Sequence, residues 1–328
     1  MQDLISLFSD LKFKINKLSK NFGRVIYLLA LGIISLLFIF LWQRFFSSSN
    51  LTISFLDIGQ GDAILFTFPD GKQILLDSGR DENIIHKVDN NLSFFDREID
   101  FAILSHPDGD HINGYVSLFD KYNFKNILKN IDRDDKNFSF LELEKKIELS
   151  KKEKDSKIFL GYCGDKFIFD QSSNEHYFPT LYILNPVKGE TRFKDNNQNS
   201  LVILLTFGDY SFLFTGDIDK ETERRVLFNI DRCFSTEDSN LIEDKLKSLT
   251  VLKVSHHGSD TASSLEFIKY LKPEYSIISA GKNNSYGHPA KTTLDTLEKY
   301  SKYIFNTIEK GDIKITTDGD NFEIDFAK

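Results

Sequence analysis

One short segment of the sequence carries two histidines and two aspartates in a closely spaced pattern. It reads His106-Pro107-Asp108-Gly109-Asp110-His111. Because alternate residues of an extended chain point the same way, His106 and Asp108 can bind one ion. Asp110 and His111 fall on the other side, at the start of an expected helix, and can bind a second. Imidazole and carboxylate ligands without a thiolate favour zinc, manganese or iron over soft copper or an iron–sulfur cluster.

Four further segments with acids or histidines each follow an expected strand, and five of the seven histidines lie in these five segments. The four are Leu76–Gly79, Thr215–Asp217, Ser255–Ser259 and Tyr286–Pro289. Since the carboxyl ends of strands share one edge of a sheet, these segments are expected to converge there. Asp217 follows a buried strand and can bridge two ions. Clustered buried aspartates without a cation are costly, which disfavours hydrogen-bonded loops that bind no metal.

The elements that must position these residues can be traced from hydrophobic patterns and turn signals. Strands are expected over 51–58, 63–68, 73–77, 101–105, 201–207, 211–215, 250–254 and 275–280, with a hairpin over 312–326. Helices are expected over 112–122, 141–157, 220–228 and 264–271. The 141–157 helix is rich in Glu and Lys and is expected to be a solvated face. From residue 250 the alternation of strand and helix is typical of an α/β layer.

Composition limits the class of protein. The chain has 328 residues, 41% hydrophobic and 27% charged, which excludes wholesale disorder. Two cysteines, Cys163 and Cys233, exclude a disulfide scaffold and a cysteine-based zinc finger. They can form one bridge, which their spacing alone does not establish. The net charge of −8 argues against strong nonspecific binding of nucleic acid.

The N-terminal region predicts a membrane anchor. Residues 25–43 contain no charge, and 19 residues of helix span about 28 Å, close to the hydrocarbon thickness of a bilayer. Five basic residues precede this segment, so residues 1–24 are expected in the cytoplasm and the body outside the cell membrane. The expected organisation is a basic cytoplasmic N-terminus (1–24), a transmembrane anchor (25–43), a linker (44–50) and a hydrolase domain (51–328). The alternatives for this segment are a cleaved signal peptide and a buried helix of an intracellular hydrolase.

Taken together, the motifs resemble a known family. His106–His111 resembles the His-x-His-x-Asp-His signature of metallo-β-lactamase-fold hydrolases, with Asp108 in place of the middle histidine. The wider set resembles the hydrolase domain of ComEC-type DNA-internalisation competence proteins over about residues 51–310. Its members are Asp57–Asp62, Leu76–Gly79, Asn199–Leu201, Phe214–Asp217, His256–Ser259 and Tyr286–Pro289.

The resemblance implies a four-layer αββα sandwich of the α/β class, here preceded by one transmembrane helix. It also implies a metal-dependent hydrolase with two divalent ions, zinc or manganese. In that family the domain is thought to degrade the non-imported DNA strand, so the expected substrate is a phosphodiester such as single-stranded DNA. The many-helix channel region of the family is not visible in this chain, which makes a separate DNA-uptake channel an expected partner.

The motifs also imply roles for single residues. One ion is assigned to His106, Asp108 and Asp217, and the other to Asp110, His111 and Asp217. Asp110 is expected to take part in catalysis as well. One of His256 and His257 should complete the metal site and the other could protonate the leaving oxygen, and their sequence positions leave this choice open.

The remaining candidates surround the ligands. His288 is expected to face the substrate as proton donor, with a ligand role as the alternative. Asn199 stands near the place of a missing third-motif histidine and is expected to orient substrate or water. Asp77 is expected to orient a metal-bound histidine. For Asp57 and Asp62, a turn-structuring role and direct contact with the site are both open.

The resulting hypothesis is a membrane-anchored phosphodiesterase or nuclease related to competence DNA processing. Two divalent ions carry four positive charges against three from Asp108, Asp110 and Asp217, which leaves a site that attracts a phosphate. Because one fold serves many substrates, two alternatives remain. One is a cell-envelope phosphodiesterase resembling a teichoic-acid phosphorylcholine esterase. The other is a non-catalytic metal-binding relative.

Overall fold

The computed structural model describes residues 22–23, 25–39, 50–93, 95–130, 138–169, 177–190 and 195–327. The chain divides into two compact units, Met1–Ser48 and Ser49–Lys328. In the first unit, residues 25–39 are helical. None of the helices in the described residues is both long enough and apolar enough to cross a membrane. The predicted anchor over 25–43 extends into residues outside those described.

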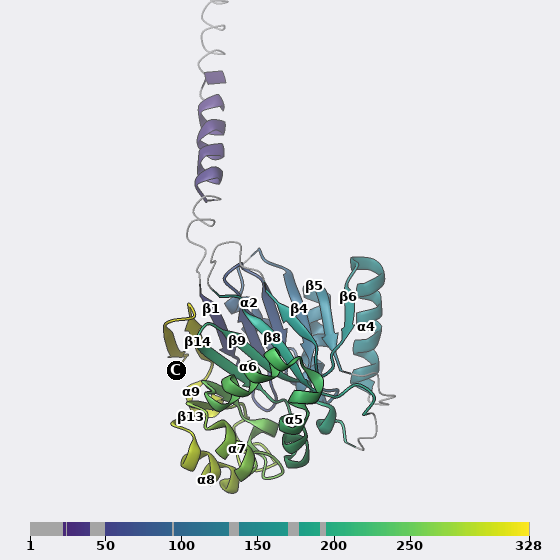
Figure 1. The fold of residues 1–328 in the computed structure, drawn as a ribbon. Coiled ribbons are helices and arrows are strands. Elements are labelled where there is room, and N and C mark those ends of the chain that lie inside the picture. The colour runs from purple at the N-terminus through teal and green to yellow at the C-terminus, as the bar shows by residue number, and fades with distance from the viewer. Residues whose placement is uncertain are drawn as a thin grey trace, which may run out of the picture. The chain divides into compact units, whose positions relative to one another are not determined.

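The second unit contains two β-sheets, which Figure 1 traces with their helices. The first sheet has eight strands in the order β15-β14-β1-β2-β3-β4-β5-β6. They are β1 (Leu51–Phe55), β2 (Ile64–Thr67), β3 (Gln73–Leu76), β4 (Glu98–Leu104), β5 (Asn123–Lys129), β6 (Lys157–Leu160), β14 (Ile313–Thr317) and β15 (Phe322–Phe326). β3 to β6 run parallel, whereas β1, β2, β14 and β15 pair antiparallel.

The second sheet has seven strands in the order β13-β12-β11-β10-β9-β8-β7. They are β7 (Lys166–Ile168), β8 (Thr180–Asn185), β9 (Val202–Phe207), β10 (Tyr210–Phe214), β11 (Val251–Lys253), β12 (Tyr275–Ile278) and β13 (Tyr303–Asn306). β10 to β13 are parallel, so their carboxyl ends lie at one edge. This is the arrangement that can gather side chains from distant segments.

Helices cover the outer face of each sheet. They are α2 (Asn83–Asn91), α3 (Gly109–Lys121), α4 (Phe138–Lys154), α5 (Lys220–Cys233), α6 (Thr236–Lys247), α7 (Leu265–Leu271), α8 (Lys291–Tyr300) and α9 (Thr307–Lys310). Apolar side chains of α2, α3 and α4 join one core cluster with the first sheet. Those of α5 to α8 join another with the second sheet. The predicted α/β sandwich with helix, sheet, sheet and helix layers is therefore confirmed.

A third apolar cluster lies between the two sheets and holds them together. It draws on alternate, fully buried residues of both sheets, as the period-two pattern of the strands requires. Phe55 of β1 and Phe214 of β10 illustrate this, with ring centroids 6.1 Å apart. Burial of this apolar area is the main source of stability for such a sandwich.

Several predicted elements differ from the structure in their bounds. The helix expected from residue 112 begins at Gly109, so Asp110 and His111 lie inside its first turn. The helix expected over 220–228 continues to Cys233, begun by the Asp219 carboxylate, which accepts the Thr222 N–H at 2.8 Å. None of β5 to β8 is predicted from the sequence. β6 and β7 are short and largely exposed, which weakens their hydrophobic pattern, whereas β8 is buried along its whole length.

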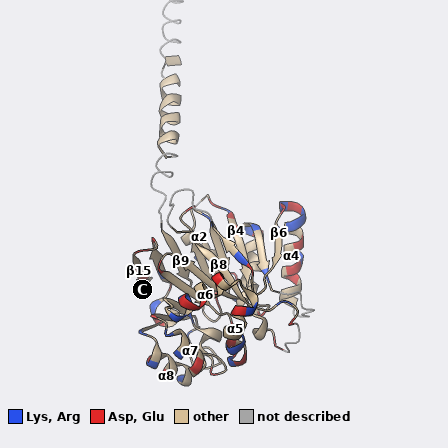
Figure 2. Cartoon of the chain, viewed as in Figure 1, with Lys and Arg blue, Asp and Glu red and all other residues tan. Residues whose placement is uncertain are grey.

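Two further expectations can be compared directly. α4 carries alternating acidic and basic side chains along its exposed length, as Figure 2 shows, and buries only Leu143, Ile147 and Ser150. It is the solvated helix that its charge run predicts. Cys163 and Cys233 form a disulfide that ties the segment before β7 to the end of α5.

Candidate metal centre

The segment after β4 changes from extended to helical backbone within its metal-binding motif. Asp108 keeps an extended conformation as the residue preceding α3, while Asp110 and His111 belong to the first turn of that helix. The rings of His106 and His111 nevertheless lie side by side, with centroids 4.1 Å apart. The start of a helix also favours a carboxylate such as Asp110 electrostatically.

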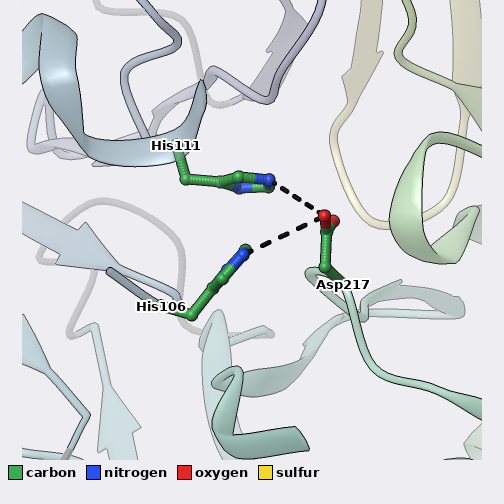
Figure 3. A group of neighbouring side chains, drawn as sticks. All are labelled: His106, His111 and Asp217. Carbon is green, nitrogen blue, oxygen red and sulfur yellow. Dashed lines mark ion pairs between the residues drawn. The ribbon is translucent and has the colours of Figure 1, made fainter. Parts of the chain in front are cut away.

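Four imidazoles surround the carboxylate of Asp217. Their Nε2 atoms lie 3.3 Å (His111), 3.4 Å (His257), 3.7 Å (His256) and 3.9 Å (His106) from Asp217 Oδ2. Figure 3 shows the rings of His106 and His111 pointing at this carboxylate from one side. The expected convergence of the segments after β4, β10 and β11 is therefore present in the structure.

Asp77 orients two of these rings. Its Oδ2 accepts a hydrogen bond from His111 Nδ1 at 2.8 Å and another from Ser105 Oγ at 2.6 Å. Because Ser105 Oγ donates to Asp77, it can accept the Nδ1–H of His106, which lies 2.9 Å away. Both rings then carry their proton on Nδ1 and present the Nε2 lone pair to Asp217. Such a carboxylate behind a ligating imidazole is typical of metal sites.

His257 is oriented in the same way by a backbone group. Its Nδ1 donates to the Ser279 carbonyl oxygen at 2.9 Å, which again leaves Nε2 as the free acceptor. His256 and His257 both have positive φ angles, 50° and 54°, and Asp77 has 57°. Non-glycine residues rarely adopt this left-handed conformation, and strained backbone of this kind concentrates at functional sites.

The cluster fits a bound cation. The Nε2 atoms of His106, His111 and His257 and Oδ1 of Asp217 are buried, and none has a hydrogen-bond partner among the described residues. Buried polar atoms without partners are costly, unless a further group satisfies them. Of the four residue groups whose donor atoms lie within 4.8 Å of one another, two are His106 with His111 and Asp217, and Asp110 with His111 and His257. They share His111, so they form one continuous centre.

The charges of the centre also favour cations. Burial by itself lowers the pKa of His257, but Asp217 and Asp62 outweigh it and raise this pKa to about 9. The pKa of His111 is raised well above its usual value against the same effect of burial, by Asp217 and Asp77. With neutral imidazoles, the carboxylates therefore leave the centre with a net negative charge. Divalent ions supply that balance.

Asp108 and Asp110 flank the cluster. Asp110 Oδ2 is 3.4 Å from His257 Nε2, which places it with the buried imidazoles. Asp108 Oδ2 is 3.8 Å from His106 Nε2, and its side chain is 40% exposed. Asp108 Oδ1 also accepts a hydrogen bond from Asn196 Nδ2 at 3.2 Å. Asp108 thus stands at the rim of the centre beside His106.

Asp62 reaches the centre with a partner that the sequence did not reveal, Lys253. Lys253 Nζ lies 2.6 Å from Asp62 Oδ2 and donates to the Val254 carbonyl oxygen at 3.0 Å, and both charged side chains are buried. Burial by itself raises the pKa of Asp62, but Lys253 and His257 hold it below its usual range. Asp62 Oδ1 is 3.4 Å from His257 Nδ1. Lys253 thus supplies a fixed positive charge behind a carboxylate of the centre.

A glycine allows Asp62 to approach so closely. A Cβ atom built on Gly61 would lie 2.0 Å from the Asp110 carbonyl oxygen, and Gly61 has a φ of +125°. The Asp62 N–H donates to that same oxygen at 3.3 Å. The β1–β2 loop therefore packs backbone against backbone on the start of α3, which only glycine permits here.

Asp57 and Asn199, two of the predicted site residues, make the following hydrogen bonds away from the histidine cluster. Asp57 accepts the Gly59 N–H at 3.4 Å, and its own N–H donates to Asp312 Oδ1 at 2.6 Å, as in a turn-structuring role. Asn199 donates through Nδ2 to the Asp195 carbonyl oxygen at 3.4 Å. The contact from that segment to Asp217 is made instead by Ser200 Oγ, which accepts the Asp217 N–H at 3.2 Å.

His288 stands beyond His256 on the exposed side. Its ring centroid is 5.6 Å from that of His256, and it is half-buried. Burial, and after it the charges of His256 and His257, lower the pKa of His288. The structure therefore places His288 next to the cluster, and its Nδ1 is buried without a hydrogen-bond partner among the described residues.

The fold and the His/Asp cluster together define a metallo-hydrolase scaffold. The chain is 28% identical over 284 residues to ComE operon protein 3 of Bacillus subtilis (strain 168), covering 81% of this chain and 33% of that protein. It is 27% identical over 303 residues to Recombination protein 2 of Haemophilus influenzae, covering 90% and 33%. The chain thus spans about a third of the length of these curated relatives. They confirm its resemblance to ComEC-type competence proteins.

No protein-family model matches the chain. Among solved structures, it is similar to Igni18, a metallo hydrolase from Ignicoccus hospitalis, with a TM-score of 0.47 and 12% identity over 82% of this chain and 98% of that one. A diphosphatase of the PhnP family gives a TM-score of 0.44 and 12% identity, over 82% and 97%. Similarity at this level assigns no function.

Proposed function

We propose that this protein is a metal-dependent phosphodiesterase that cleaves single-stranded DNA. The observation that carries the proposal is the set of buried, partnerless Nε2 atoms directed at Asp217 from three elements of the described structure. The relatives, named for competence and recombination, support DNA as the substrate.

Different residues of this chain would bind the two ions. Asp110, His111 and His257 would hold one divalent ion, zinc or manganese, and His106 with Asp108 the other. Asp217 would be shared by both. Ions held there supply Lewis-acid polarisation of a phosphodiester and a nucleophilic water at neutral pH.

The surrounding residues fix this arrangement and handle protons. Asp77, Ser105 and Ser279 hold the imidazole protons on Nδ1, so that Nε2 remains available. His288 would donate a proton to the leaving oxygen from the exposed side. A bound phosphodiester anion would favour the protonated imidazole and so offset the low pKa that burial gives His288.

We also propose that the protein is held in the cell membrane by residues 25–43, with the hydrolase unit outside. The uncharged segment and the basic residues before it support this orientation. The Cys163–Cys233 disulfide adds support, because disulfides persist mainly in oxidising compartments. A separate DNA-uptake channel would then be the partner. Protease added to intact cells should digest the hydrolase unit and spare the N-terminus, and protection of that unit would contradict the orientation.

Turnover by the purified full-length chain tests the activity. With manganese or zinc it should cleave a labelled single-stranded oligonucleotide and also bis-p-nitrophenyl phosphate, and the Asp110→Ala variant should cleave neither. Hydrolysis of the small ester without DNA cleavage would shift the substrate to another phosphodiester, such as an envelope polymer. Failure with both substrates by metal-loaded protein would indicate the non-catalytic relative.

A further inference from the structure

The loop between β12 and α8 presents an aromatic ring beside the metal centre. Tyr286 is 66% exposed, although it lies in a segment whose neighbours are ordered by hydrogen bonds. Its ring stacks on that of His288, with centroids 5.7 Å apart and planes inclined by 24°. One face of the tyrosine is thus covered by an imidazole, while much of the rest of the side chain is open to solvent.

Asn284 holds this loop in place. Its Oδ1 accepts the N–H groups of Tyr286 at 3.2 Å and His288 at 2.9 Å. Its Nδ2 donates to the carbonyl oxygens of His288 at 2.6 Å and Gly281 at 3.0 Å. A single side chain therefore makes four hydrogen bonds to the backbone of the loop. The position of the tyrosine is set before any ligand arrives, which lowers the entropy cost of binding.

The loop is also tied to the other sheet. The Gly281 N–H donates to Gln60 Oε1 at 3.2 Å, and Gln60 lies in the β1–β2 loop that carries Asp62. The tyrosine is therefore positioned relative to both halves of the centre. A mobile surface side chain would have no such connection.

A row of rings leads outward from Asp217 to Tyr286. His256 Nε2 is 3.7 Å from Asp217 Oδ2, the His288 ring is 5.6 Å from that of His256, and Tyr286 follows at 5.7 Å. These contacts connect Tyr286 to the metal centre through His288 and His256. A base near a phosphate held at the centre would come within reach of the open surface of Tyr286.

We propose that Tyr286 is a stacking subsite for a nucleobase that flanks the scissile phosphate of single-stranded DNA. This inference rests on the proposed function, and it names the residue that recognises the nucleic acid part of the substrate. An exposed aromatic ring binds single strands by stacking, and does so with little sequence preference, because every base has a π-face. It also gives an acidic protein a means of holding DNA that does not depend on a basic surface.

Binding of matched oligonucleotides to the full-length chain tests the subsite. The probes are a short single-stranded oligonucleotide with a cleavage-resistant phosphorothioate backbone and its fully abasic counterpart, each followed by fluorescence anisotropy in manganese. The wild-type protein should bind the base-bearing strand about 5- to 150-fold more tightly than the abasic one, the range that stacking of one base provides.

Variants assign that preference to one ring. Tyr286→Ala should bring the ratio of the two dissociation constants close to one and leave the abasic strand's own binding unchanged. Tyr286→Phe should keep the preference. Phe228→Ala serves as a matched control, since Phe228 is a 71% exposed ring on α5, and it should keep the preference too.

The outcomes separate this inference from the proposed activity. Equal binding of both strands by the wild type, or an unchanged preference in Tyr286→Ala, overturns the subsite. A preference that is lost in Tyr286→Ala, in a protein that cleaves no DNA, supports the subsite and contradicts the proposed nuclease activity alone.

Discussion

The buried side and the rim of the metal centre are built differently. On the buried side, His111 and His257 are fully enclosed, and each donates from Nδ1 to a close acceptor, Asp77 Oδ2 at 2.8 Å or the Ser279 carbonyl oxygen at 2.9 Å. On the rim, the side chain of His256 is 27% exposed, and its Nδ1 has only Thr261 Oγ1 at 3.3 Å. Neighbouring residues with the same left-handed backbone therefore differ in burial and in how closely their Nδ1 atoms are hydrogen-bonded.

This difference teaches which part of the centre is rigid. The buried side can hold a cation in one geometry, because its ligands are fixed by groups behind them. The rim, with Asp108, His256 and His288, has fewer such supports, so an ion held there would exchange more easily. We therefore expect the two ions to bind with unequal affinity, and the following changes test that comparison.

Removal of the shared carboxylate should have the largest effect. In Asp217→Ala both sides lose a ligand, so bound metal should fall by more than in Asp110→Ala or His111→Ala, which each lose about one ion per chain. Turnover should be abolished in all three. Metal content of the purified proteins measures this, and retention of both ions by Asp217→Ala would show that the carboxylate is not shared.

Substitutions of His256 and His257 should have the next largest effects, and these effects on metal binding should differ. His257→Ala should release the ion of the buried side, whereas His256→Ala should keep that ion and lose at most the one at the rim. Equilibrium dialysis against the divalent ion gives both affinities. The comparison fails if His256→Ala empties the centre and His257→Ala leaves it intact.

The buried ion pair behind the centre gives a prediction about stability. Lys253→Met removes the buried cation closest to Asp62 and leaves this carboxylate with the His257 ring, 3.4 Å away, which should cost about 3–5 kcal/mol in the free energy of unfolding. Adding Asp62→Asn removes the uncompensated charge and should recover most of that loss. Denaturant unfolding of the metal-free proteins measures both. A single variant as stable as the wild type would mean that Lys253 does not neutralise Asp62.

The smallest effect on bound metal is expected for a substitution of His288. His288→Ala should retain both ions and slow an alkyl phosphodiester by about 10²–10⁴-fold, because an alkoxide needs a proton as it departs. A p-nitrophenyl ester, whose leaving group is stable as an anion, should be slowed much less. Loss of metal from this variant would make His288 a ligand.

The sequence predicted the convergence of the centre, because loops at the carboxyl ends of parallel strands share an edge within each sheet. It did not predict that the segments after β3 and β4 belong to one sheet and those after β10 and β11 to the other. It did not decide between His256 and His257, since their difference arises from left-handed backbone and from Ser279 on the next strand. It missed Lys253, because a lysine within an otherwise apolar strand gives no sign of a buried aspartate more than a hundred residues earlier. The pairing of Cys163 with Cys233 likewise depended on tertiary contacts.

The stoichiometry of metal needed for turnover distinguishes a two-metal hydrolase from the alternatives. Full-length protein stripped with a chelator is titrated with manganese while bound ions and hydrolysis of bis-p-nitrophenyl phosphate are followed together. We expect no turnover without metal, a tight first ion, a weaker second ion, and activity that rises with the second. Full turnover in chelator, or failure to bind any divalent ion, would contradict it.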